Sequence, residues 1–454
     1  MISSISPIDG SVVAQYEETS KEEVQHHIEK AAALQREWEQ VEIEERARPM
    51  MRLAELLESN RDELAELMAD EMGKPISQGA GEVDKCAWVC RHYAENAERI
   101  LADEMIPADR TKSYVAYRPL GVVLAVMPWN FPLWQVYRFL APALMGGNGG
   151  ILKHASNVTG CALWIDRLAV EAGFPDGLFR SLVVPSSRVD EVLEHPSVVA
   201  ATLTGSDPAG RAVASRAGSL LKKTVLELGG SDPYIVLADA DLEQAAATCA
   251  NSRLINSGQS CIAAKRFIVE ESVADEFTRL LAKGLSKAVM GNPHDASTTL
   301  GPMAREDLRD ELHRQVERSV EAGANLVMGG EVPDGPGAYY PPTLLSGVRD
   351  GMAVYHEETF GPVAAVISAT DLDDAVRIAN DTEFGLGAAI FTSDVDLGER
   401  VARDRLQAGA CFVNAFVASD PRLPFGGTKM SGYGRELSDM GMKEFLNAKT
   451  VVVA

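Results

Sequence analysis

The sequence has little positive charge, few cysteines and no long apolar run. Its 454 residues include 43 Lys and Arg against 66 Asp and Glu, so the formal net charge is −23 at pH 7. Such an acidic chain disfavours nucleic acid and anionic membranes as partners. The six cysteines form no dense framework and no paired Cys-x-x-Cys motif. We therefore expect reduced thiols, and we expect no bound metal.

The most apolar segment, residues 121–147, is a poor membrane span. Three prolines, Asn130 and Arg138 interrupt it, which is more typical of a buried strand, turn and helix. The first residues, Met1 to Ser4, carry no basic segment followed by an apolar one. We therefore expect no secretion signal and a cytoplasmic location.

Two kinds of pattern divide the chain. Residues 21–101 carry apolar positions at helical spacing between charged ones, which predicts a helical layer. After them, strand-like and helix-like segments alternate, which predicts parallel sheets covered by helices. One α/β series reaches Gly229-Gly230, and a second follows it. The strand-like segments are 113–127, 149–153, 180–184, 198–204, 233–236, 265–269, 363–368 and 411–414, and the helix-like ones are 133–145, 159–172, 188–193, 208–217, 242–255, 273–289 and 372–380.

Cys261 is a candidate nucleophile. It ends the segment Asn256-Ser257-Gly258-Gln259-Ser260-Cys261, in which small polar residues follow a predicted helix and leave the sulfur approachable. A buried structural cysteine is an equally good interpretation of the position taken alone.

Glu227 is a candidate general base. It lies in an apolar strand that ends in two glycines, Thr224-Val225-Leu226-Glu227-Leu228-Gly229-Gly230. Desolvation there would raise the pKa of the carboxyl toward neutrality, as the activation of water requires. An exposed glutamate at a strand end is the alternative.

Asn130 is a candidate oxyanion donor, because two prolines and two aromatic residues hold its amide at the end of an apolar strand. A turn asparagine that bonds its own backbone is the alternative. Gly205 and Ser206 follow a strand and open a helix, whose first amides could meet a pyrophosphate. Their spacing is not G-x-G-x-x-G, and helix caps of this kind are common without a ligand.

These segments together resemble the aldehyde dehydrogenase superfamily, in order and spacing, over essentially the whole chain. The matching segments are Pro128-Trp129-Asn130-Phe131-Pro132, Lys153, Thr204-Gly205-Ser206, Glu227-Leu228-Gly229-Gly230, Gly258-Gln259-Ser260-Cys261, Glu358-Thr359-Phe360-Gly361-Pro362-Val363 and Pro424-Phe425-Gly426-Gly427. The resemblance implies an aldehyde dehydrogenase fold of the α/β class, with a Rossmann-like cofactor domain, an α/β catalytic domain and a small β oligomerisation arm.

The resemblance also implies domain limits and site residues. The cofactor domain would comprise residues 1–104 and 121–229, the catalytic domain 230–431, and the arm 105–120 and 432–454, in a homodimer or homotetramer. Cys261 would form a thiohemiacetal and then a thioester with an aldehyde. Asn130 and the Cys261 amide would hold the oxyanion, and Glu227 would activate water. The residues implied around the cofactor are Trp129, Lys153, Ser156, Gly205, Ser206, Leu228, Gly229, Glu358 and Phe360.

Within that superfamily the chain is most similar to bacterial succinate-semialdehyde dehydrogenases. Arg138 stands where the family has a carboxylate-binding arginine, and the other residues expected at the substrate are Ser419, Trp134 and Ser260. A second arginine found in some relatives is replaced by Ile255. Glutarate semialdehyde or another aliphatic aldehyde is therefore the alternative substrate.

The residue at position 156 indicates the cofactor. Many NAD-preferring relatives carry Glu there, which bonds the ribose hydroxyl and repels a 2′-phosphate. Ser156 and Lys153 could both donate to that phosphate, so we expect NADP to be preferred and NAD to be used as well. The retained Glu227 disfavours an acylating dehydrogenase. The intact Cys261, Glu227 and Asn130 disfavour a catalytically idle binding protein.

Overall fold

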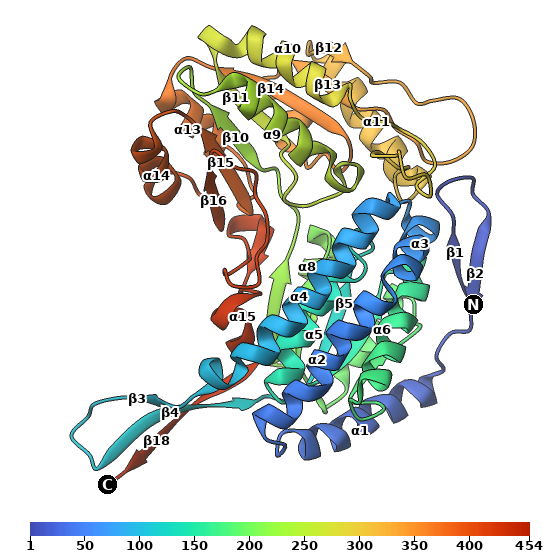
Figure 1. Ribbon diagram of the computed structural model, residues 1–454, viewed down its shortest axis with the longest axis vertical. Helices are drawn as coiled ribbons and strands as arrows, with labels where there is room; N and C mark the ends of the chain where they lie inside the picture. Colours follow the sequence, from blue (N-terminus) through green and yellow to red (C-terminus); the bar gives the residue numbers. More distant parts are fainter.

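A six-stranded sheet forms the centre of the lower lobe in Figure 1, which shows the computed structural model of residues 1–454. Its strand order is β17-β9-β8-β5-β6-β7, and all neighbours are parallel except β17 and β9. The carboxyl ends of β5 and β8 form a topological switch point, where open α/β sheets bind their ligands. The strands are β5 (Val122–Met127), β6 (Gly149–His154), β7 (Phe179–Ser181), β8 (Val198–Thr204), β9 (Lys223–Glu227) and β17 (Gly432–Tyr433).

Helices cover this sheet, and α5 is buried along its whole length. The sequence of α5 is apolar almost throughout, which fits a helix that contacts protein on every side, because α4 packs over it. The predicted helical layer is confirmed. The helices of this lobe are α1 (Lys21–Trp38), α2 (Ile43–Ser59), α3 (Arg61–Met72), α4 (Ile76–Leu101), α5 (Trp134–Met145), α6 (Thr159–Ala172), α7 (Val189–Glu194), α8 (Asp207–Ser219) and α15 (Ser438–Lys443).

The upper lobe is built on a seven-stranded sheet of order β12-β13-β14-β11-β10-β15-β16. Only β12 and β13 are antiparallel. Successive residues of β11 enter opposite hydrophobic cores, Phe267 and Val269 on one face and Ile268 on the other, as expected for a parallel sheet covered on both sides. The strands are β10 (Pro233–Val236), β11 (Arg266–Glu270), β12 (Asn325–Met328), β13 (Thr343–Ser346), β14 (Val363–Ala369), β15 (Gly387–Phe391) and β16 (Ala410–Val413).

Several elements of this lobe had no counterpart among the sequence expectations. They include α11, α14, β12, β13 and β15. Most residues of α11 are charged and only four are buried, while β12 is an exposed edge strand, so neither shows a strong apolar pattern. The helices of the lobe are α9 (Leu242–Leu254), α10 (Ala274–Leu285), α11 (Glu306–Glu321), α12 (Ala353–His356), α13 (Leu372–Asn380) and α14 (Val395–Asp404).

A three-stranded arm projects from the lower lobe (Figure 1). Its strands are β3 (Glu104–Met105), β4 (Lys112–Pro119) and β18 (Leu446–Val453), and β18 pairs with β4 along its whole length. The expected C-terminal piece of the arm, 432–454, is too long. Residues 432–433 pair with β9 of the cofactor sheet and α15 packs against α5, so the arm begins at Leu446. At the other end of the chain, β1 (Ile2–Ile5) and β2 (Val12–Tyr16) form a hairpin.

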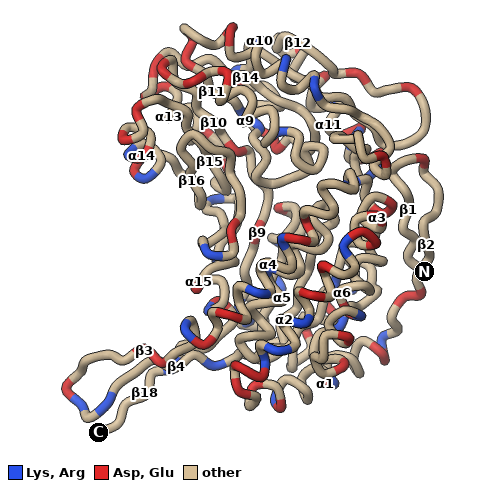
Figure 2. The backbone as a smooth tube through the Cα atoms, viewed as in Figure 1, with Lys and Arg blue, Asp and Glu red and all other residues tan.

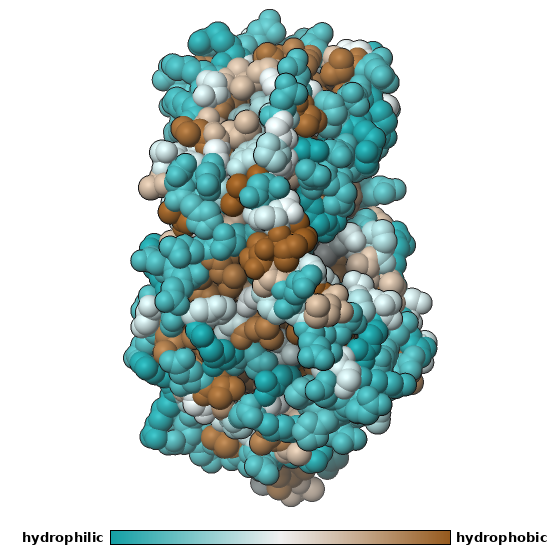
Figure 3. Space-filling view, turned by 90° about the vertical axis from the view of Figure 1, so that its right-hand side faces the viewer, coloured by the Kyte–Doolittle hydropathy of each residue, from teal (hydrophilic) through white to brown (hydrophobic).

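Charged residues of both signs are distributed along both lobes and the arm (Figure 2). The face in Figure 3 is mostly hydrophilic, and its largest hydrophobic area lies near mid-height, where the lobes meet. No helix combines the length and the apolar character needed to cross a bilayer.

Candidate active site

A strained loop carries Cys261. After α9 the chain forms a short turn, Ile255–Gly258, in which Asn256, Ser257 and Gly258 all have positive φ, at 53°, 55° and 76°. Gly258 is required for packing as well as for conformation, because a Cβ there would lie 2.3 Å from the carbonyl of Gly361. The loop is therefore pressed against the segment that contains Glu358 and Phe360.

Lys265 fastens this loop. Its buried ammonium donates to the carbonyl oxygens of Ser260, Cys261 and Ala263 at 3.0, 2.8 and 3.3 Å. Lys265 Nζ also lies 3.5 Å from Glu358 Oε1. One cation thus fixes the backbone on both sides of the sulfur, and no sequence motif indicated this contact.

Cys261 is half-buried and faces the cavity described below. Burial raises the pKa of its thiol to about 12, although the positive charges of Arg138 and Lys265 oppose that rise. The sulfur therefore carries its proton near neutral pH, and attack on a carbonyl requires a base that removes it.

Asn130 lies directly after β5 and beside the Cys261 loop. Its Nδ2 donates to the carbonyl of Gln259 at 3.1 Å, and Asn256 Nδ2 donates to the Asn130 carbonyl at 2.6 Å. His154 Nε2 donates to Pro132 O at 2.8 Å, while its Nδ1 accepts from the Ala155 amide at 2.9 Å. Burial lowers the pKa of His154 to about 4, so this neutral ring holds the turn.

Glu227 ends β9 in a buried position, and neither carboxyl oxygen has a hydrogen-bond partner. Burial, reinforced by the nearby Glu436, raises its pKa well above the ordinary range, while Arg138 opposes the rise. The backbone closes tightly around it, since a Cβ on Gly426 would lie 2.7 Å from Glu227 Oε1. Glu227 is thus a buried carboxyl group whose surroundings favour its neutral form.

Arg138 is paired inside the protein. Its Nε forms an ion pair with the buried carboxylate of Glu436, and its Nη2 donates to Thr204 Oγ1 at 3.1 Å. No protein group engages Nη1. Glu436 was missed from the sequence because it lies almost 300 residues from its partner. The structure brings Arg138 to the cavity wall, and its role in binding a carboxylate stays a prediction.

A second buried ion pair sets the position of α5. Lys74 and Glu82 form it, with side chains only 1% and 2% exposed. Glu82 Oε1 also accepts from the amides of Leu133 and Trp134, both at 2.9 Å, so a carboxylate from α4 caps the first turn of α5. Sequence reasoning missed this pair too, because neither residue belongs to a motif.

The residues expected around a cofactor meet where the two sheets end. Lys153 is the last residue but one of β6 and is only 5% exposed. Its ammonium donates to Ser186 Oγ at 3.2 Å and has no carboxylate partner. Ser156 follows it in a half-buried turn. Ser206 precedes α8 as its N-cap residue, but its side chain forms no capping hydrogen bond, which leaves the first amides of that helix free. A buried ammonium without a carboxylate partner and a helix start with free amides are both groups that bind phosphates.

The other residues expected around the cofactor come from the catalytic lobe, from the turn after β5 and from the end of β9. Glu358 Oε1 accepts from the Gly230 amide at 3.0 Å, and a Cβ on Gly229 would lie 2.5 Å from Glu358 Oε2. The rings of Phe360 and Trp129 meet edge to face at 5.7 Å. The Leu228 amide donates to Ser431 O at 3.0 Å. Residues from both lobes thus contribute to one site.

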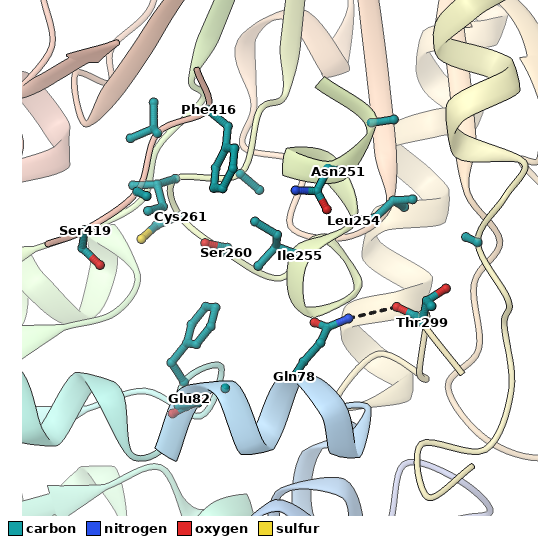
Figure 4. A pocket seen from close by; sticks show the side chains of 18 of the residues that line it. Gln78, Glu82, Asn251, Leu254, Ile255, Ser260, Cys261, Thr299, Phe416 and Ser419 are labelled. Atoms are coloured by element: carbon teal, nitrogen blue, oxygen red, sulfur yellow. Dashed lines mark hydrogen bonds between the residues drawn. The ribbon is translucent and has the colours of Figure 1, made fainter. Parts of the chain in front are cut away.

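A cavity of about 870 Å³ lies on the other side of Cys261. Figure 4 shows the Cys261 sulfur and the Ser419 hydroxyl pointing into it, with α4 and Glu82 opposite. The residues expected at the substrate all line this cavity, namely Arg138, Ser419, Trp134 and Ser260. Their roles in binding remain predictions. Lys85, which sequence reasoning did not select, lines it as well.

The whole chain matches known proteins of one family. Residues 1–451 match the aldehyde dehydrogenase family. A probable NADP(+) succinate-semialdehyde dehydrogenase of Synechocystis sp. is 48% identical over 453 residues, with 100% of both chains covered. The NADP(+) succinate-semialdehyde dehydrogenase of Mycobacterium avium is 49% identical, over 99% of this chain and 96% of that one.

Solved structures agree with the sequence matches. The succinic semialdehyde dehydrogenase of Streptococcus pyogenes, in complex with NADP+, has a TM-score of 0.97 at 37% identity, with 100% of both chains covered. An aldehyde dehydrogenase from Brucella melitensis has a TM-score of 0.96 at 33% identity, over 100% of this chain and 94% of that one. The chain therefore belongs to the aldehyde dehydrogenase family. The predicted fold and the predicted class of enzyme, an NAD(P)-dependent aldehyde dehydrogenase, are confirmed.

Proposed function

We propose that this enzyme oxidises succinate semialdehyde to succinate, with NADP as the preferred cofactor and NAD as a second one. The main observation that supports this substrate is the cavity beside Cys261, in which cationic and hydroxyl groups face a half-buried thiol. In a protein of net charge −23, such a locally basic cavity favours a small anion over a neutral aldehyde. The relatives named for this substrate and for NADP(+) support the same proposal.

The first chemical step joins Cys261 to the aldehyde carbon. The thiol loses its proton to a base as its sulfur attacks the carbonyl, and the carbonyl oxygen gains the negative charge. Asn130 donates one amide N–H to Gln259 and keeps the other. That free N–H and the Cys261 backbone amide hold the oxyanion.

A nicotinamide cofactor, when bound, would supply the acceptor for the hydride that leaves the former aldehyde carbon, and Cys261 would then carry a thioester. Lys153 and Ser156 would hold the 2′-phosphate, the first turn of α8 at Gly205 and Ser206 the pyrophosphate, and Glu358 the ribose on the nicotinamide side. Trp129, Leu228, Gly229 and Phe360 would shape the walls of the cofactor site.

Glu227 then activates water. Its carboxylate takes a proton from a water molecule while the water oxygen attacks the thioester, the C–S bond breaks, and the sulfur is reprotonated. A base with a raised pKa accepts this proton more readily than an ordinary carboxylate would. The Arg138–Glu436 pair beside it keeps a second negative charge neutralised.

The test is a comparison of aldehydes and cofactors. We expect kcat/KM for succinate semialdehyde to exceed that for butanal by at least about tenfold, because only the first carries a carboxylate. NADP should give the lower cofactor KM. Cys261→Ser should abolish both oxidations. Equal efficiency with butanal, or greater efficiency with glutarate semialdehyde, would contradict the proposal that succinate semialdehyde is the substrate. Equal KM values for NAD and NADP would overturn the preference.

A further inference from the structure

Lys85 places a second cation in the substrate cavity. It lies on α4, one turn after Glu82, and is half-buried. Its Nζ donates to Ser419 Oγ at 2.7 Å and lies 4.4 Å from the centre of the Trp134 ring. A hydroxyl and an aromatic face thus fix the ammonium at the wall of the cavity that Cys261 also lines.

Lys85 forms no ion pair with an acidic residue, whereas three buried cations of the active-site region each form one. Arg138 is matched by Glu436, Lys74 by Glu82, and Lys265 by Glu358. No carboxylate lies within ion-pair distance of Lys85. Two other lysines of the cavity lining, Lys283 and Lys287, are exposed to solvent.

The surroundings of Lys85 disfavour its positive charge. Burial and the nearby charge of Arg138 lower the pKa of Lys85 to about 8, although Cys86, Glu82 and Asp420 oppose that fall. An anion that enters the cavity would stabilise the ammonium by supplying the missing partner.

We propose that Lys85 is the residue that binds the substrate carboxylate, with Ser419 as the neighbouring donor and Trp134 as the surface along which the two methylene groups lie. This inference rests on the proposed function. Arg138 can then offer the substrate carboxylate only its Nη1, because its charge is already balanced by the ion pair with Glu436 and its Nη2 donates to Thr204. Lys85 acts on substrate selection, since no contact links it to the sulfur or to Glu227.

The test replaces Lys85 by Met, which keeps the stem and removes the charge, and by Arg, which keeps the charge. For succinate semialdehyde we expect Lys85→Met to raise KM by roughly 10- to 100-fold with kcat nearly unchanged. The KM for butanal should not change. Lys85→Arg should recover much of the lost affinity. Lys21→Met, an exposed lysine at the start of α1, makes the same change in net charge and should alter neither KM.

A pH series adds a second readout. For the wild type, KM for succinate semialdehyde should rise above about pH 8 as Lys85 loses its proton, and this rise should be absent in Lys85→Met. An unchanged KM in Lys85→Met, or equal increases for both aldehydes, overturns the inference while leaving the proposed function intact. A wild type without preference for succinate semialdehyde overturns both. A normal butanal rate shows that each variant has folded.

Discussion

At the scale of single residues, burial raises the pKa of the two groups that are expected to exchange protons, Glu227 and Cys261. Glu227 has no hydrogen-bond partner, and Cys261 is held as a thiol by burial. Cys261 must lose its proton before it attacks a carbonyl, and Glu227 must be ionised when it accepts a proton from water. The cost of keeping Glu227 out of water should be measurable as a dependence of folding stability on pH.

We expect Glu227→Gln to stabilise the fold increasingly as pH rises. The folded pKa of Glu227 is raised, and the unfolded value is about 4.3. Between those values the folded state binds more protons than the unfolded state, so the free energy of unfolding falls with rising pH. Glu227→Gln cannot titrate at this position, so this decrease in the free energy of unfolding should be absent from the variant. Urea denaturation at about pH 5 and about pH 8 should show that the stability of the variant relative to the wild type is greater at the higher pH.

Glu227→Asp is the control, because it keeps the acid and should keep the fall. A difference between Glu227→Gln and the wild type that is independent of pH would show that Glu227 is ionised in the folded state. The catalytic effect is separate: Glu227→Gln should still form the thioester but hydrolyse it slowly.

Sequence motifs identified the residues expected to react but not those that hold them. Cys261, Glu227 and Asn130 each lie in a short local pattern. Glu436, Lys265 and Lys85 act through contacts with other elements. Their partners are set by tertiary packing, which single-sequence patterns do not report.

At the scale of elements, the turn before Cys261 links the two halves of the site. Left-handed backbone is costly at Asn256 and Ser257, whereas Gly258 adopts it freely and makes the turn fit against Gly361. The turn therefore couples the position of the sulfur to that of Glu358 and Phe360.

We expect Gly258→Ala to lower kcat by at least about 100-fold, because a Cβ 2.3 Å from the Gly361 carbonyl must displace the loop. The melting temperature should also fall. Gly218→Ala is the matched control: it lies in α8, where an added Cβ meets no atom within 4 Å, and should stabilise slightly. Steady-state kinetics and thermal melting check both. A fully active Gly258→Ala would show that the turn can move without displacing the sulfur.

Elements with strong patterns were predicted well. Val198–Thr204 and Pro233–Val236 are buried strands at the expected residues. The charged helix α11 and the exposed strand β12 were not predicted, since burial gives them little pattern to read. The length of the arm was overestimated because residues 432–433 pair with β9, a partner that sequence distance conceals.

At the scale of the whole molecule, the arm is the part least explained by one chain. Its outer strand β18 pairs with β4 on one side only, and Met105, Ile106, Val452 and Val453 are exposed. A free strand edge with apolar side chains is a site for pairing with another chain. We propose that it completes a sheet in a homodimer or homotetramer.

Removal of residues 447–454 should therefore reduce the assembly to smaller species. Light scattering of the purified protein would measure the mass, and removal of Ala454 alone serves as the control. The melting temperature of the truncated protein should also depend less on protein concentration than that of the full chain. An unchanged mass would show that the arm does not hold the subunits together.

The pairing of β17 with β9 also has a consequence for synthesis on the ribosome. The cofactor lobe receives its edge strand and Glu436 only after the whole catalytic lobe has been translated. Until then Arg138 has no counter-charge, and the side of the sheet that carries Glu227 is open. A nascent chain that already contains Cys261 is therefore incomplete, and a premature stop codon just before residue 432 would yield a protein with its nucleophile intact and its active site unassembled.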